Sequence, residues 1–219
     1  MTFTKPADIE RESMRIIDDE LSHRGVTLSG ETAAVIRRVI HTTADFDYLE
    51  TLRFTNHAVS RGAAAMRDSV IVTDTNMARA GISARALEKL GAQVRCFMAE
   101  DFIAQSAREQ GTTRAVAAMD WALDHFPGAV LAVGNAPTAL LRIAERIEQG
   151  ARPALVVGVP VGFVNVEQSK ERILDVCTRH DIPAIVALGR KGGSTVAAAI
   201  CNALAYTAAG MLDPEARKL

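Results

Sequence analysis

Cysteine, membrane-length apolar runs and an apolar leader are scarce or missing in this sequence. Only Cys96, Cys177 and Cys201 are cysteines, and none of them forms a Cys-x-x-Cys pair. We therefore expect reduced, mostly buried thiols of a cytoplasmic protein rather than a disulfide framework. The longest nearly apolar run, residues 154–164, is too short to cross a bilayer, and the first residues lack the apolar core of a signal peptide. No membrane association is expected.

An excess of charge of either sign is also missing. The formal net charge is -1, whereas broad nucleic-acid binding needs a strongly positive surface. Aromatic residues make up only 5% of the chain, so the core is expected to consist mainly of aliphatic side chains. A chain of 219 residues buries about 70% of its unfolded surface, which is enough for one domain without a metal or disulfide. We expect that single domain to span 1–219, with tails near 1–8 and 210–219.

The apolar periodicity predicts N-terminal helices followed by alternating strands and helices. The first helices are expected at 9–21, 31–41 and 56–66. Buried strands are expected at 70–73, 94–98, 129–133, 154–159 and 184–188, and helices at 84–90, 113–124, 138–149, 167–179 and 194–208. This alternation predicts an α/β fold, a three-layer α/β/α domain with a mainly parallel, Rossmann-like central sheet.

Polar, glycine-containing loops follow the predicted strands. Ligands of such sheets bind at the carboxyl ends of the strands. The loop at 189–195 enters a helix at Ser194, and it could either bind an anion or simply cap that helix. It matches neither a P-loop nor the Gly-x-Gly-x-x-Gly fingerprint. The loop at 134–138 is similar, because Asn135 could cap a helix whose first turn contains Pro137. Side by side, the two loops would suit a ligand with several carboxylates.

His41 stands at the end of the second predicted helix, one turn after Arg38. The negative end of the helix favours the imidazolium and Arg38 disfavours it, so the proton could be held near neutrality, where acid catalysis works best. The alternative is a surface histidine that caps carbonyls. Ser13 lies on the apolar face of the first helix and could bond back to a carbonyl. Arg114 opens a helix, where an anionic partner or plain solvation would suit it. The histidines show no metal-ligand spacing.

Six blocks occur together in one order. They lie at 40–48, 73–77, 111–114, 134–140, 158–165 and 189–195, and include Gly-Asn-Ala-Pro-Thr at 134–138 and Pro-Val-Gly-Phe-Val in the fifth. The set resembles the precorrin-8X methylmutase family, including its cobalt-precorrin-8 branch. The resemblance covers residues 9–206. One departure is Gln168, where many relatives carry Glu before Ser-Lys.

The resemblance implies an isomerase of corrin biosynthesis that performs a 1,5-sigmatropic methyl shift. The product would be hydrogenobyrinic acid, or cobyrinic acid if the substrate contains cobalt. The Gly-Arg-Lys-Gly-Gly sequence resembles the cobalt branch slightly more. It implies no dissociable cofactor, and a homodimer with active sites near the interface. His41 matches the catalytic histidine, and Ser13, Arg38 and Arg114 match substrate-binding positions. The helix starts at Asn135 and Ser194 are expected to join these arginines in holding the carboxylates of the tetrapyrrole.

Three alternatives stay open on the residues alone. The chain could be an α/β enzyme that acts on a phosphorylated small molecule, with residues 192–194 as a phosphate cradle. It could be a non-catalytic tetrapyrrole carrier. It could also be a purely structural dimer partner, although polar loops at several strand ends argue against that.

Overall fold

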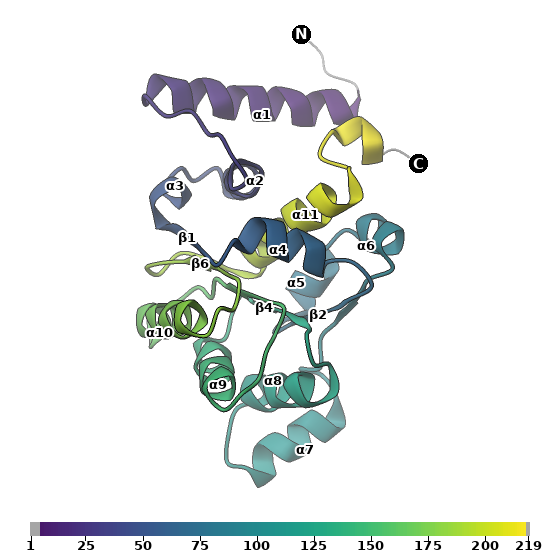
Figure 1. Cartoon of the computed structure of the whole chain (residues 1–219), viewed down its shortest axis with the longest axis vertical. Coiled ribbons are helices and arrows are strands. Elements are labelled where there is room, and N and C mark those ends of the chain that lie inside the picture. Colours follow the sequence, from purple (N-terminus) through teal and green to yellow (C-terminus); the bar gives the residue numbers. More distant parts are fainter. Residues whose placement is uncertain (1–4, 218–219) are drawn as a thin grey trace.

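The computed structural model describes residues 5–217 and has a six-stranded sheet at its centre, with strand order β1-β6-β5-β4-β2-β3 (Figure 1). The strands are β1 (Leu52–Thr55), β2 (Val70–Thr73), β3 (Gln93–Arg95), β4 (Val130–Val133), β5 (Leu155–Gly158) and β6 (Ala184–Ala187). All neighbours pair in parallel except β1, which runs antiparallel to β6. The predicted α/β fold with a mainly parallel sheet is confirmed.

Helices cover both faces of the sheet in separate layers (Figure 1). One layer contains α2 (Ala33–Thr43), α4 (Ala58–Ala65), α5 (Asn76–Gly81), α6 (Ala84–Leu90) and α11 (Ser194–Ala209). The opposite layer contains α8 (Arg114–His125), α9 (Pro137–Glu148) and α10 (Val166–Arg179). Outside these layers lie α1 (Pro6–His23), next to α2, and α7 (Asp101–Glu109), next to α8.

Strand β1 is the main element that the sequence pattern did not predict. It is a short edge strand in which only Leu52 is fully buried, so it lacks the continuous apolar run of the central strands. The short helices α3 (Tyr48–Thr51) and α5, helix α7 and the terminal 3-10 helix η1 (Pro214–Arg217) were also missed. Strand β3 ends at Arg95, three residues before its predicted end.

Both expected tails contain ordered structure. Helix α1 begins at Pro6 rather than at Ile9, because proline has no N–H to lose in the first turn of a helix. At the other end, η1 packs against α1. Within residues 5–217 no helix combines the length and the apolar character that a bilayer span requires.

The antiparallel edge strand brings the end of α2 to the carboxyl side of the sheet. Leu52, the first residue of β1, pairs with Ala187, the last residue of β6. The segment from α2 to β1 therefore lies beside the loop that follows β6. Lys191 of that loop contacts Asp45 and Asp47 of the segment at 2.7 and 2.6 Å.

Candidate active site

His41 lies in the last turn of α2, and Ser13 of α1 faces it. The Ser13 Oγ atom is 2.7 Å from His41 Nδ1, a hydrogen bond that joins the two helices. Helix α1 lies across α2 at the end of the molecule (Figure 1). Ser22, on the same helix, instead donates to a carbonyl one turn earlier, the oxygen of Asp18. The hydroxyl of Ser13 thus binds the imidazole rather than a carbonyl one turn earlier in its own helix.

A cavity of about 430 Å³ opens beside this pair. Its wall is largely apolar and comes from α1, the end of α2 and the segment after it. It is lined by Ile9, Glu12, Ser13, Ile16, Ile17, Glu20, Ile40, His41, Ala44 and Phe46. Ile9 and Ile16 are about half exposed, at 52% and 46%. A wall of this kind suits the carbon surface of a large ligand, and its titratable groups are those of Glu12, Glu20 and His41.

The environment lowers the pKa of the His41 imidazole. Burial is the largest cause, and the positive charge of Arg38 adds to it. Arg217 lowers the pKa slightly further, whereas the negative charge of Glu10 raises it. The sequence predicted that the end of the helix and Arg38 would oppose each other and hold the pKa of His41 near neutrality. In the structure, burial and Arg38 outweigh the raising effect of Glu10. The ring is therefore mostly neutral at pH 7.

Arg38 is held by an ion-pair cluster that the sequence did not reveal. Its Nη2 atom lies 2.6 Å from Glu10 Oε1, and Arg217 reaches the same carboxylate at 2.9 Å. The guanidinium carbons of Arg38 and Arg217 lie 5.4 and 4.5 Å from the ring centroid of Tyr206. Glu10 stands three residues before Ser13, so helical spacing alone could have placed it near Ser13.

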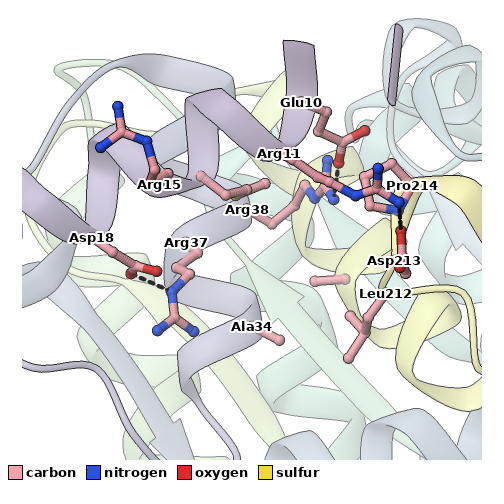
Figure 2. Close-up of a pocket in the computed structure, with 12 residues that line it drawn as sticks. Glu10, Arg11, Arg15, Asp18, Ala34, Arg37, Arg38, Leu212, Asp213 and Pro214 are labelled. Carbon is pink, nitrogen blue, oxygen red and sulfur yellow. Dashed lines mark hydrogen bonds and ion pairs between the residues drawn. The ribbon is translucent and has the colours of Figure 1, made fainter. Parts of the chain in front are cut away.

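Arg38 lines a second cavity, which lies on the other side of α1 and has a volume of about 560 Å³. Figure 2 shows its side chain with Arg11, Arg15 and Arg37 around this space. Each arginine has a carboxylate partner: Asp213 for Arg11, Glu12 and Asp19 for Arg15, Asp18 for Arg37 and Glu10 for Arg38. Arg38 thus influences His41 by its charge while its guanidinium is paired on the far side of the helix.

The other three predicted site residues lie at the carboxyl edge of the sheet. Arg114 is the first residue of α8, is exposed, and forms no ion pair with any residue in 5–217. Asn135 is exposed in the turn before α9. Ser194 begins α11, and its Oγ lies 2.7 Å from Thr75 Oγ1. A Cβ atom on Gly134 would meet Ser194 Cα at 2.8 Å, so the two glycine loops lie side by side.

The start of α9 is occupied by a carboxylate of the protein itself. Asp74, which is 1% exposed at the end of β2, accepts the backbone N–H groups of Gly134, Asn135 and Ala136, each at 2.8 Å. Burial raises the pKa of Asp74, and these three hydrogen bonds oppose that rise. The backbone N–H groups of these three residues are therefore not free for a ligand carboxylate. The side chain of Asn135 remains exposed.

The structure brings Ser13 and His41 together but leaves Arg114 apart from them. Helix α8 covers the face of the sheet opposite to α2 (Figure 1).

Gln168, the departure from the usual glutamate, is exposed on α10. The three cysteines are free and buried, and their predicted burial is confirmed. Residues 5–217 contain no group of three or more His, Cys, Asp or Glu side chains arranged to bind a metal ion.

Comparison with known proteins is consistent along nearly the whole chain. The precorrin-8X methylmutase family model matches residues 8–207. The cobalt-precorrin-8 methylmutase of Salmonella typhimurium is 43% identical over 209 residues, covering 92% of this chain and 95% of its own. The precorrin-8X methylmutase of Pseudomonas aeruginosa is 37% identical, with 90% and 93% covered.

The crystal structure of precorrin-8X methylmutase from Thermus thermophilus has the same fold. It matches with a TM-score of 0.83 and 42% identity, covering 93% of this chain and 96% of that one. Sequence and fold thus agree over the same residues, including both groups of predicted site residues. The chain belongs to the precorrin-8X methylmutase family of isomerases.

Proposed function

We propose that this chain converts cobalt-precorrin-8 to cobyrinic acid by a 1,5-sigmatropic methyl shift, with His41 as the general acid. The observation that carries the proposal is the Ser13–His41 hydrogen bond at the wall of an apolar cavity. A concerted methyl shift needs no nucleophile. What the protein contributes is a proton and a fixed orientation of the macrocycle.

Ser13 orients the imidazole in both of its protonation states. When His41 is protonated, both ring nitrogens carry a proton and the Ser13 hydroxyl accepts from Nδ1–H. After Nε2 has given up its proton, the neutral ring keeps the proton on Nδ1 and the hydroxyl still accepts it. The ring keeps one position during proton transfer, and Nε2 is the atom that gives the proton to the macrocycle.

The proton balance of the reaction follows from its being an isomerisation. His41 Nε2 protonates the conjugated system next to the migrating methyl group and makes the accepting carbon electron-poor. The methyl group leaves one ring carbon and bonds to its neighbour, while the electron pairs redistribute within the ring. A proton then leaves the ring and returns to the imidazole, so neither the enzyme nor the solvent gains a proton.

The carboxylates of the macrocycle are bound at the carboxyl edge of the sheet. Arg114 supplies an exposed cation there that has no ion-pair partner among residues 5–217, and the side chains of Asn135 and Ser194 supply hydrogen bonds. Arg38 adds positive charge near His41, although Glu10 already binds its guanidinium. Arg38 therefore acts on the substrate mainly through its charge.

A second copy of the chain completes the site in this proposal. Arg114 and His41 are on helices that cover opposite faces of one sheet, so one macrocycle reaches both most simply across an interface. Exposed apolar side chains near the carboxyl edge need a cover, since Met77, Phe163 and Val164 are 67%, 83% and 76% exposed. The homodimer and the macrocycle together would provide it.

Mixing two damaged variants tests this shared site. His41→Ala and Arg114→Met are each expected to be nearly inactive, since each lacks one half of every site. After dissociation and reassociation of an equal mixture, half of the dimers carry one intact site. Activity should then return to about a quarter of the wild-type value. No recovery would mean that both residues act within one copy.

The choice of cobalt over metal-free substrate is tested directly with both compounds. The Salmonella relative is named for cobalt-precorrin-8 and the Pseudomonas relative for precorrin-8X. The protein is mixed with each substrate, and the visible spectrum is followed as the conjugation lengthens. We expect faster conversion of the cobalt compound. Binding of either compound without spectral change would favour a tetrapyrrole carrier instead.

The structure disfavours a phosphate cradle at residues 192–194. The N–H of Gly193 donates to the Val159 carbonyl at 2.8 Å, and a Cβ atom on Gly192 would lie 2.2 Å from that oxygen. The loop is packed against its neighbour rather than open to a phosphate.

Because the three cysteines are free and buried, we also propose that the enzyme works in the reducing cytoplasm.

A further inference from the structure

Lys170 is a fully buried lysine in α10, and the proposed reaction does not use it. Its residue exposure is 0%, and it stands between Val166 and Ile173 on the apolar face of the helix. Burying an ammonium group costs several kcal/mol unless it gains hydrogen-bond partners. Burial lowers the pKa of Lys170 to about 8. A position on this face would otherwise suit an aliphatic residue.

The partners of Lys170 are two carbonyl groups of the loop after β6. Its Nζ atom donates to the oxygens of Gly189 at 2.7 Å and Lys191 at 2.8 Å. These carbonyls are two residues apart, so the backbone curves around one ammonium group. Gly189 has a φ of +75°, in the left-handed region that glycine adopts without strain. The loop is therefore shaped from inside by a single side chain.

The outer side of the same loop contacts the segment that follows the catalytic helix. Lys191 Nζ lies 2.7 Å from Asp45 Oδ2 and 2.6 Å from Asp47 Oδ2. Asp45 is four residues after His41 and directly follows Ala44, the C-cap residue of α2. Exposed ion pairs of this kind add little to stability, so their value lies in the geometry that they fix.

We propose that Lys170 is a positioning residue for the reaction: it fixes the loop at 189–193, which, through Lys191, holds the end of α2 and so the position of His41. The buried ammonium group of Lys170 orders the loop and thereby positions Lys191. Lys191 in turn binds the segment directly after α2, whose last turn carries His41. The catalytic part of this inference rests on the proposed function. The structural part, that Lys170 orders the loop, does not.

Hydrogen exchange tests the structural part without any substrate. The amides of Gly193 and Gly162 donate to the carbonyls of Val159 and Arg190, so they report on the order of the loop. In Lys170→Met, both amides should exchange at least about tenfold faster than in the wild type. In Lys89→Met, a change at an exposed lysine of α6, they should exchange at the wild-type rate. Unchanged exchange in Lys170→Met would overturn the proposal.

Turnover tests the catalytic part through a double-mutant comparison. Lys170→Met and Lys191→Met should each lower kcat, the first by about tenfold, with little change in substrate affinity. The double variant should be no slower than Lys170→Met alone, because both changes break one link. Effects that multiply would contradict the link.

Two further outcomes are covered by the same set of variants. Lys191 is exposed, so Lys191→Met is expected to fold even if Lys170→Met does not, and an unchanged kcat in it would overturn the proposal. If the wild type converts neither macrocycle, the proposed function fails. The exchange rates would then still decide whether Lys170 orders the loop.

Discussion

Ser13 and His41 are 28 positions apart in the chain, yet the Ser13 hydroxyl lies 2.7 Å from His41 Nδ1. This contact joins α1 to the last turn of α2, which carries the proposed acid. It fixes the orientation of the imidazole at the wall of the cavity. The role of Ser13 in this account is thus to position the acid, in addition to any contact with the substrate.

Ser13→Ala should therefore slow the chemical step more than it weakens binding. Without the hydroxyl, the imidazole can rotate and exchange its tautomers. We expect kcat to fall by about tenfold to a hundredfold, since a positioned acid contributes about 10²–10⁴-fold. Stopped-flow spectra measure turnover, and equilibrium titration measures binding. The matched control is Ser22→Ala on the same helix, and a similar loss of kcat in it would argue against a specific role for Ser13.

Arg38→Met should raise the pKa of His41. Arg38 lowers that pKa by charge repulsion, while Glu10, which the change leaves paired with Arg217, raises it. NMR titration of the His41 ring protons measures the shift. Arg37→Met removes a neighbouring arginine that is paired with Asp18, and should have little effect. An unchanged His41 pKa in Arg38→Met would show that burial alone sets it.

The same shift fixes the sign of two pH dependences. The folded pKa of His41 lies below its unfolded value near 6.5, so the native state binds fewer protons than the unfolded chain in that window. This contribution to stability is complete above pH 6.5 and is lost as the pH falls through the folded pKa. Because the acid must be protonated, kcat/KM should decline as the pH rises through the pKa of the free enzyme, and Arg38→Met should move the decline to higher pH. If the decline occurs at the same pH in Arg38→Met as in the wild type, a group other than His41 causes it.

Substrate binding should take up protons. The carboxylates of the macrocycle bring negative charge to a cavity where the empty enzyme holds His41 mostly neutral, so binding raises its pKa. Calorimetry in buffers of different ionisation enthalpy, near pH 7, should show uptake of part of one proton. His41→Ala should abolish this uptake while the macrocycle still binds. Equal uptake in both proteins would assign the proton to another group.

Asp74→Asn should destabilise the fold. The amide can accept fewer of the three backbone N–H groups that the buried carboxylate now satisfies. We expect the free energy of unfolding to fall by about 2–3 kcal/mol, measured by denaturant titration. Asp181→Asn breaks an exposed ion pair with Arg61 and should cost less than about 1 kcal/mol. Equal losses would deny Asp74 its role at the start of α9.

The sequence predicted the layers of the fold because each central strand is a continuous apolar run between amphipathic helices. It missed β1 because an edge strand with one buried residue has no such run. It also placed loops 134–138 and 189–195 at the carboxyl ends of strands, since parallel strands present these ends at one edge.

Contacts that depend on tertiary packing were beyond the sequence pattern. Nothing local shows that Asp74 fills the start of α9, because the two are joined only when β2 pairs with β4. Lys170 did carry a signal, since a lysine stood on the apolar face of a predicted helix. The Ser13–His41 bond needed the crossing of α1 over α2, which no spacing within one helix specifies.

The most direct test of the account is single turnover by His41→Ala with the macrocycle already bound. We expect the spectrum of the bound substrate to persist, with conversion slowed by about 10²–10⁴-fold, while affinity changes little. His23→Ala is the control, because His23 also lies in the last turn of a helix but is exposed. Conversion by His41→Ala at the wild-type rate would contradict the assignment of His41 as the acid.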